Sequence, residues 1–316
     1  MKTAARLLLG GLAVLWLFGL ACGGPKPKPD PVLIAESKRL ASQGSYWYDR
    51  GCYDRAERYF FQAMETSRLL DDLPGMLRAR NNLGAAALGL GRYDEAAEHL
   101  NKALELNRDV DSRSEASLIY GNLAGLAFKV GRAGEAESLW RRAIGEAERD
   151  KARTGLGLHL TNLGVFYRKT GRLAEARTVL DRALALAVQN KDVRGQAAVH
   201  VELGLIASEE RDLTRAQQHV SVALDLDKQA ENPAGIAYDL EQLGLIYQRK
   251  KQWSDAAREL DRAIRLYGAL ADGQAVARVY GLIKANRAAG SSPGSLGPYE
   301  RLLKASEGNT TSILCQ

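Results

Sequence analysis

Residues 81–106 read NNLGAAALGLGRYDEAAEHLNKALEL, and nearly the same pattern returns along the whole chain. It places small residues at Gly84 and Ala96, a glycine at Gly91 and a large apolar residue at Leu100. Small residues on one helix face allow a second helix to approach closely. Glycine is favoured just after a helix end because it adopts a left-handed backbone without steric penalty. The stretch therefore predicts two antiparallel helices joined by a turn at Gly91.

The pattern recurs every 40 residues without slippage. The position of Gly84 is small in every unit, as Gly44, Gly84, Ala124, Gly164, Gly204 and Gly244. The position of Ala96 is always alanine, as Ala56, Ala96, Ala136, Ala176, Ala216 and Ala256. Six units in register indicate a repeat array with one continuous core, rather than the two domains that a length of 316 residues would suggest.

This pattern resembles the tetratricopeptide repeat (TPR), an antiparallel helix pair that stacks into a solenoid. The resemblance covers residues 36–270, and the long period is that of the subgroup that includes kinesin light chains. It implies an all-α, right-handed solenoid of six helix pairs. With a capping helix at Gly273–Ala289, the solenoid is expected to occupy residues 36–289. Residues 290–316 are expected to be a C-terminal tail with a short helix at Tyr299–Ser306.

The chain begins with a targeting segment, which we assign to residues 1–21. Two basic residues precede an apolar run that is too short to span a bilayer and ends at Ala21-Cys22. The run resembles a bacterial lipoprotein signal, which implies that Cys22 is lipidated and becomes the first residue. Ordinary secretion is the alternative.

Residues 22–35 are expected to be a linker. Alternating prolines and lysines, PKPKPDP, favour an extended polyproline conformation that holds the first unit away from the lipid surface. Gly23 directly after the cysteine resembles lipoproteins of the outer membrane. We therefore expect a lipid-anchored protein of the outer membrane that faces the periplasm or the cell surface.

The remaining composition argues against several classes of function. The net charge is +6, but acidic and basic residues are interspersed along the helices, so no nucleic-acid partner is expected. No HExxH, GxSxG or Walker motif occurs, and the four histidines are not grouped as metal ligands. We expect no enzyme activity, no cofactor and no metal.

Two further cysteines, Cys52 and Cys315, lie far apart in the sequence. A bridge between them would require the tail to return along the whole array. We interpret both as isolated thiols, which are unusual in an exported protein.

The first helices of the units are expected to line the concave face. Asn82, Asn122 and Asn162 occupy the same position of successive units, although asparagine is a poor residue for a helix interior. In the long-repeat relatives, an asparagine at this position bonds the backbone of an extended bound peptide. The alternative is that duplication copied an asparagine that merely tolerates solvent.

Other residues of the expected groove suggest the chemistry of a partner. Tyr48, Leu88 and Phe128 share one position and predict an apolar entrance. A basic centre is expected to follow, formed by Lys129, Arg168 and Lys169. A segment with apolar residues followed by an acidic one would match this order.

These features predict a lipid-anchored scaffold or adaptor that binds a protein partner, either an extended peptide or a subunit, in its concave groove. Pilotin-like lipoproteins share this plan, so the resemblance implies a role in assembling a cell-envelope complex such as a pilus or secretin system. A sensor solenoid that changes curvature on binding a short signal peptide is the second hypothesis. The sequence leaves open the identity of the partner and the oligomeric state.

Overall fold

The computed structural model describes residues 31–151, 153, 155–290, 296–307 and 315. Over these ranges the chain forms six helix pairs followed by two further helices, and it has no strand. The pairs are α1 (Pro31–Tyr48) with α2 (Tyr53–Leu69), α3 (Leu73–Gly89) with α4 (Tyr93–Val110), α5 (Arg113–Lys129) with α6 (Ala133–Arg149), α7 (Leu156–Lys169) with α8 (Leu173–Gln189), α9 (Val193–Glu209) with α10 (Leu213–Gln229), and α11 (Pro233–Arg249) with α12 (Trp253–Ala269). The last two helices are α13 (Gly273–Gly290) and α14 (Gly297–Glu307).

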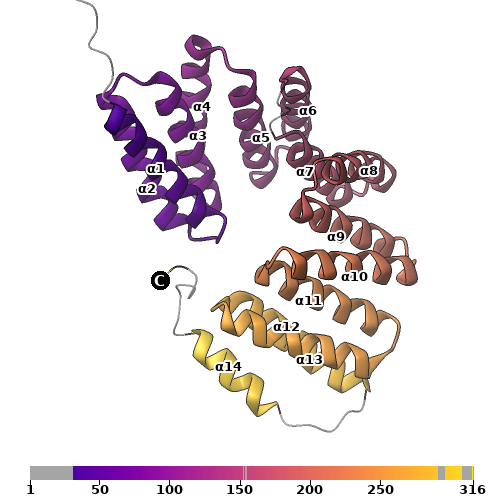
Figure 1. The fold of residues 1–316 in the computed structure, drawn as a ribbon. Coiled ribbons are helices and arrows are strands. Elements are labelled where there is room, and N and C mark those ends of the chain that lie inside the picture. The colour runs from indigo at the N-terminus through magenta and orange to yellow at the C-terminus, as the bar shows by residue number, and fades with distance from the viewer. Residues whose placement is uncertain (1–30, 152, 154, 291–295, 308–314, 316) are drawn as a thin grey trace, which may run out of the picture.

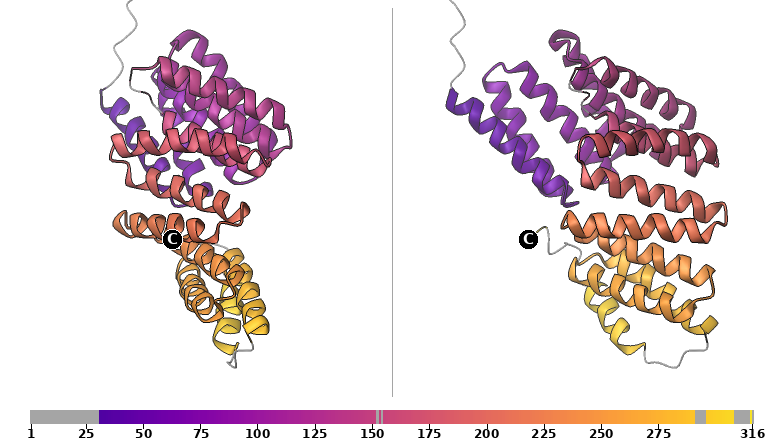
Figure 2. Two further views of the ribbon diagram at one scale, coloured as in Figure 1. Left: turned by 90° about the vertical axis from the view of Figure 1, so that its right-hand side faces the viewer. Right: turned by 45° about the vertical axis from the view of Figure 1, so that its right-hand side comes forward.

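The helix pairs stack into a right-handed solenoid that curves back on itself (Figure 1). Each second helix packs both on its own first helix and on the first helix of the next pair, so the later units lie in layers (Figure 2). Several first helices that follow one another, such as α3 and α5 or α7 and α9, are in closer contact than any two successive second helices. The first helices therefore form the inner, concave face. The predicted all-α solenoid and its capping helix α13 are confirmed.

Small residues set the spacing of the helix pairs. The six alanines at the position of Ala96 are fully buried, which leaves no room for a larger side chain. A Cβ atom added at Gly164 would lie 2.6 Å from Cγ of Leu180, the large residue that fills the same layer. These contacts explain why both positions keep small residues in every unit.

The turns within the pairs share a left-handed residue. Gly91 has φ +75°, whereas the last two complete units place Arg211 and Lys251 there with φ +66° and +61°. A side chain with a Cβ atom is disfavoured in this region by about 1 to 2 kcal/mol. These two corners are therefore strained, and the residue still adopts the left-handed conformation of the turn.

Several element boundaries differ from the sequence expectation. Helix α1 already begins at Pro31, inside the expected linker, because proline is well tolerated in the first turn of a helix. The tail helix α14 is slightly longer than expected. Residues 1–21 and Cys22 lie outside the described residues. Among the helices that are described, none combines the length and hydropathy needed to cross a membrane.

A buried acidic pair lies between α10 and α11. Asp239 is completely buried, and neither of its carboxylate oxygens accepts a hydrogen bond. Its polar neighbour is Asp227, which accepts a bond of 2.9 Å from Nδ2 of Asn232 and lies near the charge of Arg194. Burial, together with the charge of Asp227, raises the pKa of Asp239 from 3.8 to about 8. A proton on Asp239 can therefore be shared with Asp227.

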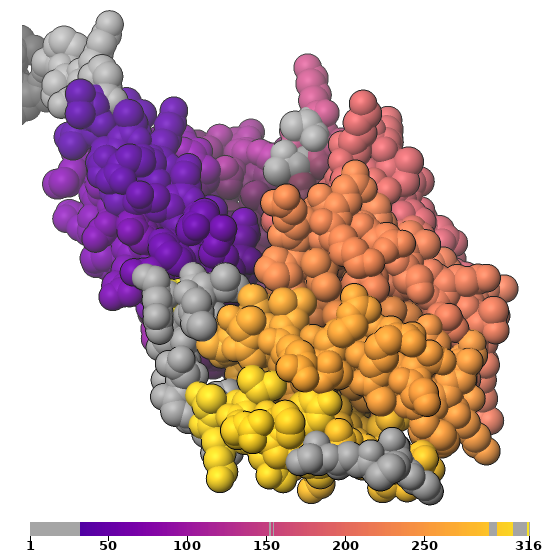
Figure 3. All heavy atoms as spheres, turned by 60° about the horizontal axis from the view of Figure 1, so that its bottom comes forward, coloured from indigo at the N-terminus to yellow at the C-terminus, as the bar shows by residue number. Residues whose placement is uncertain are grey.

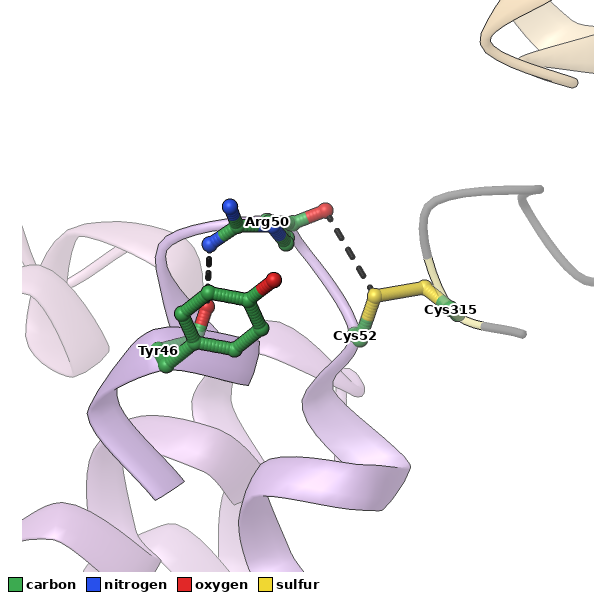
Figure 4. The surroundings of a disulfide bond; sticks show 4 residues. All are labelled: Tyr46, Arg50, Cys52 and Cys315. Atoms are coloured by element: carbon green, nitrogen blue, oxygen red, sulfur yellow. Dashed lines mark hydrogen bonds between the residues drawn. A yellow bond between two sulfur atoms is a disulfide. The ribbon is translucent and has the colours of Figure 1, made fainter. Parts of the chain in front are cut away.

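The two ends of the solenoid are joined covalently. Cys52, in the turn between α1 and α2, forms a disulfide with Cys315, with 5.4 Å between the Cα atoms (Figure 4). The interpretation of these cysteines as isolated thiols is wrong. It treated the array as an extended rod, whereas accumulated curvature turns the last helices back toward the first unit (Figures 1 and 3).

Candidate partner-binding groove

The floor of the concave face is apolar and half-buried. Gly125, Val165, Leu205 and Leu245 occupy equivalent positions on α5, α7, α9 and α11. Residues three apart on a helix lie on the same side, so Val165 neighbours Asn162 on α7. The inner face thus offers a row of apolar contacts with amide side chains beside it. We call these four residues the apolar row.

The three asparagines predicted as a site do not have equal roles. Asn122 donates from Nδ2 to Oδ1 of Asn81 over 2.9 Å, which joins α5 to α3. Asn82 and Asn162 are half-buried, and their side-chain amides bond no other described residue. Two of the three amides therefore remain available to a partner, while the third links two units.

The expected apolar entrance is present in part. Tyr48, Leu88 and Phe128 are all half-buried at the ends of α1, α3 and α5. Tyr48 packs edge-on against Tyr53, and Phe128 packs against Phe166 with 5.5 Å between ring centroids. Tyr48 thus packs within the first unit and Phe128 packs against the next unit, and only part of each surface remains for a partner.

Arg168 is engaged within the protein rather than forming a free basic centre. Its Nε donates to Glu202 over 2.7 Å, and its Nη1 donates to Glu209 over 2.8 Å. The side chains of Arg168 and Glu202 are only 13% and 14% exposed. Arg168 therefore belongs to an ion-pair cluster between α7 and α9, in which two carboxylates offset its one positive charge.

Lys129 and Lys169 keep their expected exposure. Both are exposed at the ends of α5 and α7, and the Nζ atom of Lys169 lies 5.9 Å from the ring centroid of Phe128. Positive charge in this part of the groove therefore comes from these two lysines. An acidic group of a partner would meet it next to the aromatic ring of Phe128.

Further bonds between units were not predicted from the sequence. Arg249 donates to the carbonyl oxygen of Ser208 over 3.2 Å, and Arg278 donates from Nε to Glu241 over 2.7 Å. Like the bonds of Arg168, they join residues 34 to 41 positions apart, about one repeat. Pairs of opposite charge at that spacing on first helices are the signal that could have found the bonds of Arg168 and Arg278, whereas the bond of Arg249 to a backbone carbonyl leaves no such signal. These bonds stiffen the second half of the inner face.

Histidines form contacts that the sequence did not predict. His99 and His219 occupy the same position of their units and each meets a residue of its own first helix: Arg80 at 3.0 Å and His200 at 3.1 Å. Burial lowers the pKa of both His200 and His219. In the described part of the chain, no three potential ligands gather around a metal site.

Comparison with known proteins agrees with this geometry. Residues 44–109 and 155–229 match the family model described as tetratricopeptide repeat. The fold is a TPR solenoid. No curated protein matches the chain.

Solved structures share the TPR solenoid at low identity. BtubC from P. vanneervenii is 17% identical with a TM-score of 0.55, and the match covers 76% of this chain and 92% of that one. PilF from Pseudomonas aeruginosa is 20% identical with a TM-score of 0.50, over 75% and 94%. Cut9, in a hetero-tetramer with Hcn1, is 18% identical with a TM-score of 0.51, over 88% and 57%. TPR solenoids of this kind serve as protein-interaction scaffolds.

Proposed function

We propose that this protein is a scaffold that binds an extended segment of a protein partner along its concave groove. The observation that carries the proposal is the pair of uncommitted amides on the inner face, Asn82 on α3 and Asn162 on α7, of which Asn162 lies beside the apolar row. A side-chain amide offers one acceptor and two donors, which match the carbonyl and N–H groups of an extended backbone. Apolar side chains of the segment would contact Val165 and Leu205.

The electrostatics of the groove favour a partner segment with an acidic residue. The positive charge of Arg168 is more than offset by Glu202 and Glu209, so the positive charge near Phe128 comes from Lys129 and Lys169. The acidic residue would lie against this part of the groove. Apolar residues of the segment would extend from it along the apolar row.

We further propose that the scaffold is exported and held at the outer membrane by lipid on Cys22, where it serves the assembly of a cell-envelope complex such as a pilus or secretin system. The signal-like segment before Cys22 supports export. The disulfide between Cys52 and Cys315 supports it independently, because disulfides persist mainly in oxidising compartments. The likeness of the fold to PilF fits this setting.

Site-specific photo-cross-linking in the native membrane tests the groove. A cross-linking amino acid at Leu158, which is 59% exposed on the first helix α7, should capture a partner. The matched control is Val188, 56% exposed on the second helix α8, which should not capture the partner that is captured at Leu158. A peptide covering the cross-linked segment should then compete with the purified partner for binding. Equal capture at both positions, or a peptide that does not compete, would show that the partner does not bind in the concave groove.

A further inference from the structure

The disulfide links parts of the solenoid that otherwise do not depend on each other. In a repeat array each unit contacts only its neighbours, so small rotations at every joint add up to large changes at the ends. Cys52 belongs to the first unit and is only 4% exposed, and Cys315 lies beyond the last helix. Their bond is therefore a restraint on the curvature of the whole array.

The restraint acts on the last unit because α14 is fixed to it. Tyr299 donates from Oη to Oδ1 of Asp261 on α12 over 2.9 Å, and Arg287 of α13 lies over the Tyr299 ring at 5.3 Å. Leu302 packs against the apolar cluster of the last unit. Helix α14 therefore moves together with α12 and α13.

The length of chain sets how far the ends can separate. Between the end of α14 at Glu307 and Cys315, even a fully extended backbone spans about 28 Å. The disulfide adds 5.4 Å between Cα atoms. Conformations in which the first and last units lie farther apart are excluded while the bond is intact and become accessible when it is broken.

We propose that the Cys52–Cys315 disulfide regulates the concave groove by holding it at the curvature that binds a partner. The inference rests on the proposed function. Excluding open conformations removes part of the ordering cost of binding, so the oxidised protein binds the partner segment more tightly than the reduced one. Reduction loosens the groove and releases the segment.

A dithiol reductant breaks the Cys52–Cys315 bond by thiol–disulfide exchange. Its thiolate attacks the sulfur of Cys315, the more exposed of the two cysteines, and Cys52 leaves as a thiolate that takes up a proton. The second thiol of the reductant then displaces Cys315 from the mixed disulfide. Two cysteine thiols are formed, and the reductant is oxidised to its own disulfide by the same two electrons.

The local structure allows the bond to be removed without disturbing the helices. Cys52 is the N-cap of α2, where serine is among the preferred residues. The turn around it is held by other contacts, including the Arg50 guanidinium over the Tyr46 ring at 3.5 Å (Figure 4). Cys52→Ser and Cys315→Ser should therefore keep the fold, which circular dichroism checks.

The experiment measures distance and affinity separately in the full chain. A fluorophore pair is attached through non-natural amino acids at Ser42 on α1 and Ala288 on α13, both exposed. Reduction of the wild type should lengthen the mean distance and weaken binding of the cross-linked partner segment three- to tenfold. Both serine variants should behave like the reduced protein and should not respond to reductant.

Each outcome is decisive. Free thiols in the protein purified without reductant, or an unchanged distance on reduction, overturns the restraint. A longer distance with unchanged affinity overturns the regulation and leaves the groove as a binding site. If the segment binds neither form while the distance still responds, the proposed function fails and the restraint on curvature remains.

Discussion

Replacing Arg168 with methionine separates a role in linking units from a role in attracting a partner. Methionine keeps much of the length of the side chain and removes its charge, so Glu202 would stay 14% exposed without its cation. Removing one partner of a fully buried ion pair costs about 3 to 5 kcal/mol, and an exposed pair contributes about 0 to 1 kcal/mol. Because Glu209 is 39% exposed and can turn to solvent, we expect a loss of about 1 to 3 kcal/mol, mostly from Glu202.

Urea unfolding followed by circular dichroism measures this loss, and a double-mutant cycle with Glu202→Gln isolates the pair. The double variant should recover about 1 to 2 kcal/mol relative to the sum of the single variants. The matched control is Lys169→Met, one residue along α7 and exposed, which should change stability by less than about 0.5 kcal/mol. Equal stability of the Arg168 and Lys169 variants would show that Arg168 is not ion-paired in solution. Arg168 would then be available to a partner as part of the predicted basic centre.

Three further predictions address the core, the buried acidic pair and the anchor. Ala136→Leu places a large side chain at a fully buried position and should lower the free energy of unfolding in urea by about 1 to 3 kcal/mol, whereas Ala174→Leu on the exposed face of α8 should lower it by almost nothing. Similar losses in the two variants would show that the helix interface is assigned to the wrong residues. The folded chain keeps a proton on Asp239 that the unfolded chain releases above about pH 4, so this group lowers stability as the pH rises from about 4 to about 8. Asp239→Asn should therefore be more stable than the wild type by about 2 to 4 kcal/mol at pH 8 and by little at pH 4, and a difference independent of pH would contradict the raised pKa. Cys22→Ser should accumulate as an unprocessed precursor in membrane fractions, and wild-type protein cleaved elsewhere and found in the soluble fraction would refute the lipid anchor.

The fold could be predicted because its information is local and repeated. Each unit carries the same small residues, such as Gly84 and Ala96, and six copies in register define the helix pairs and their order. Boundaries differed from the prediction outside the repeat pattern. Helix α1 begins at Pro31, within the segment that its prolines and lysines marked as a linker.

The groove could be predicted only in outline. The position shared by Asn82, Asn122 and Asn162 places them on first helices, but it does not reveal that Asn122 bonds Asn81. Arg168 was predicted to belong to a free basic centre because only its own unit was considered, whereas its carboxylate partners belong to the next unit. The disulfide depends on curvature summed over the whole array, which no single repeat encodes.

The central claim is that the inner face binds a partner through Asn82 and Asn162, and the affinity of a double alanine variant tests it most directly. If each amide makes two hydrogen bonds at about 0.5 to 1.5 kcal/mol each, the double variant should bind the cross-linked segment at least about 30-fold more weakly in isothermal titration calorimetry. The fold should remain as stable or become more so, since alanine is the better helix former. Asn101→Ala, on the exposed face of the second helix α4, should bind like the wild type. Unchanged affinity of the double variant would contradict the account and place the binding surface elsewhere on the solenoid.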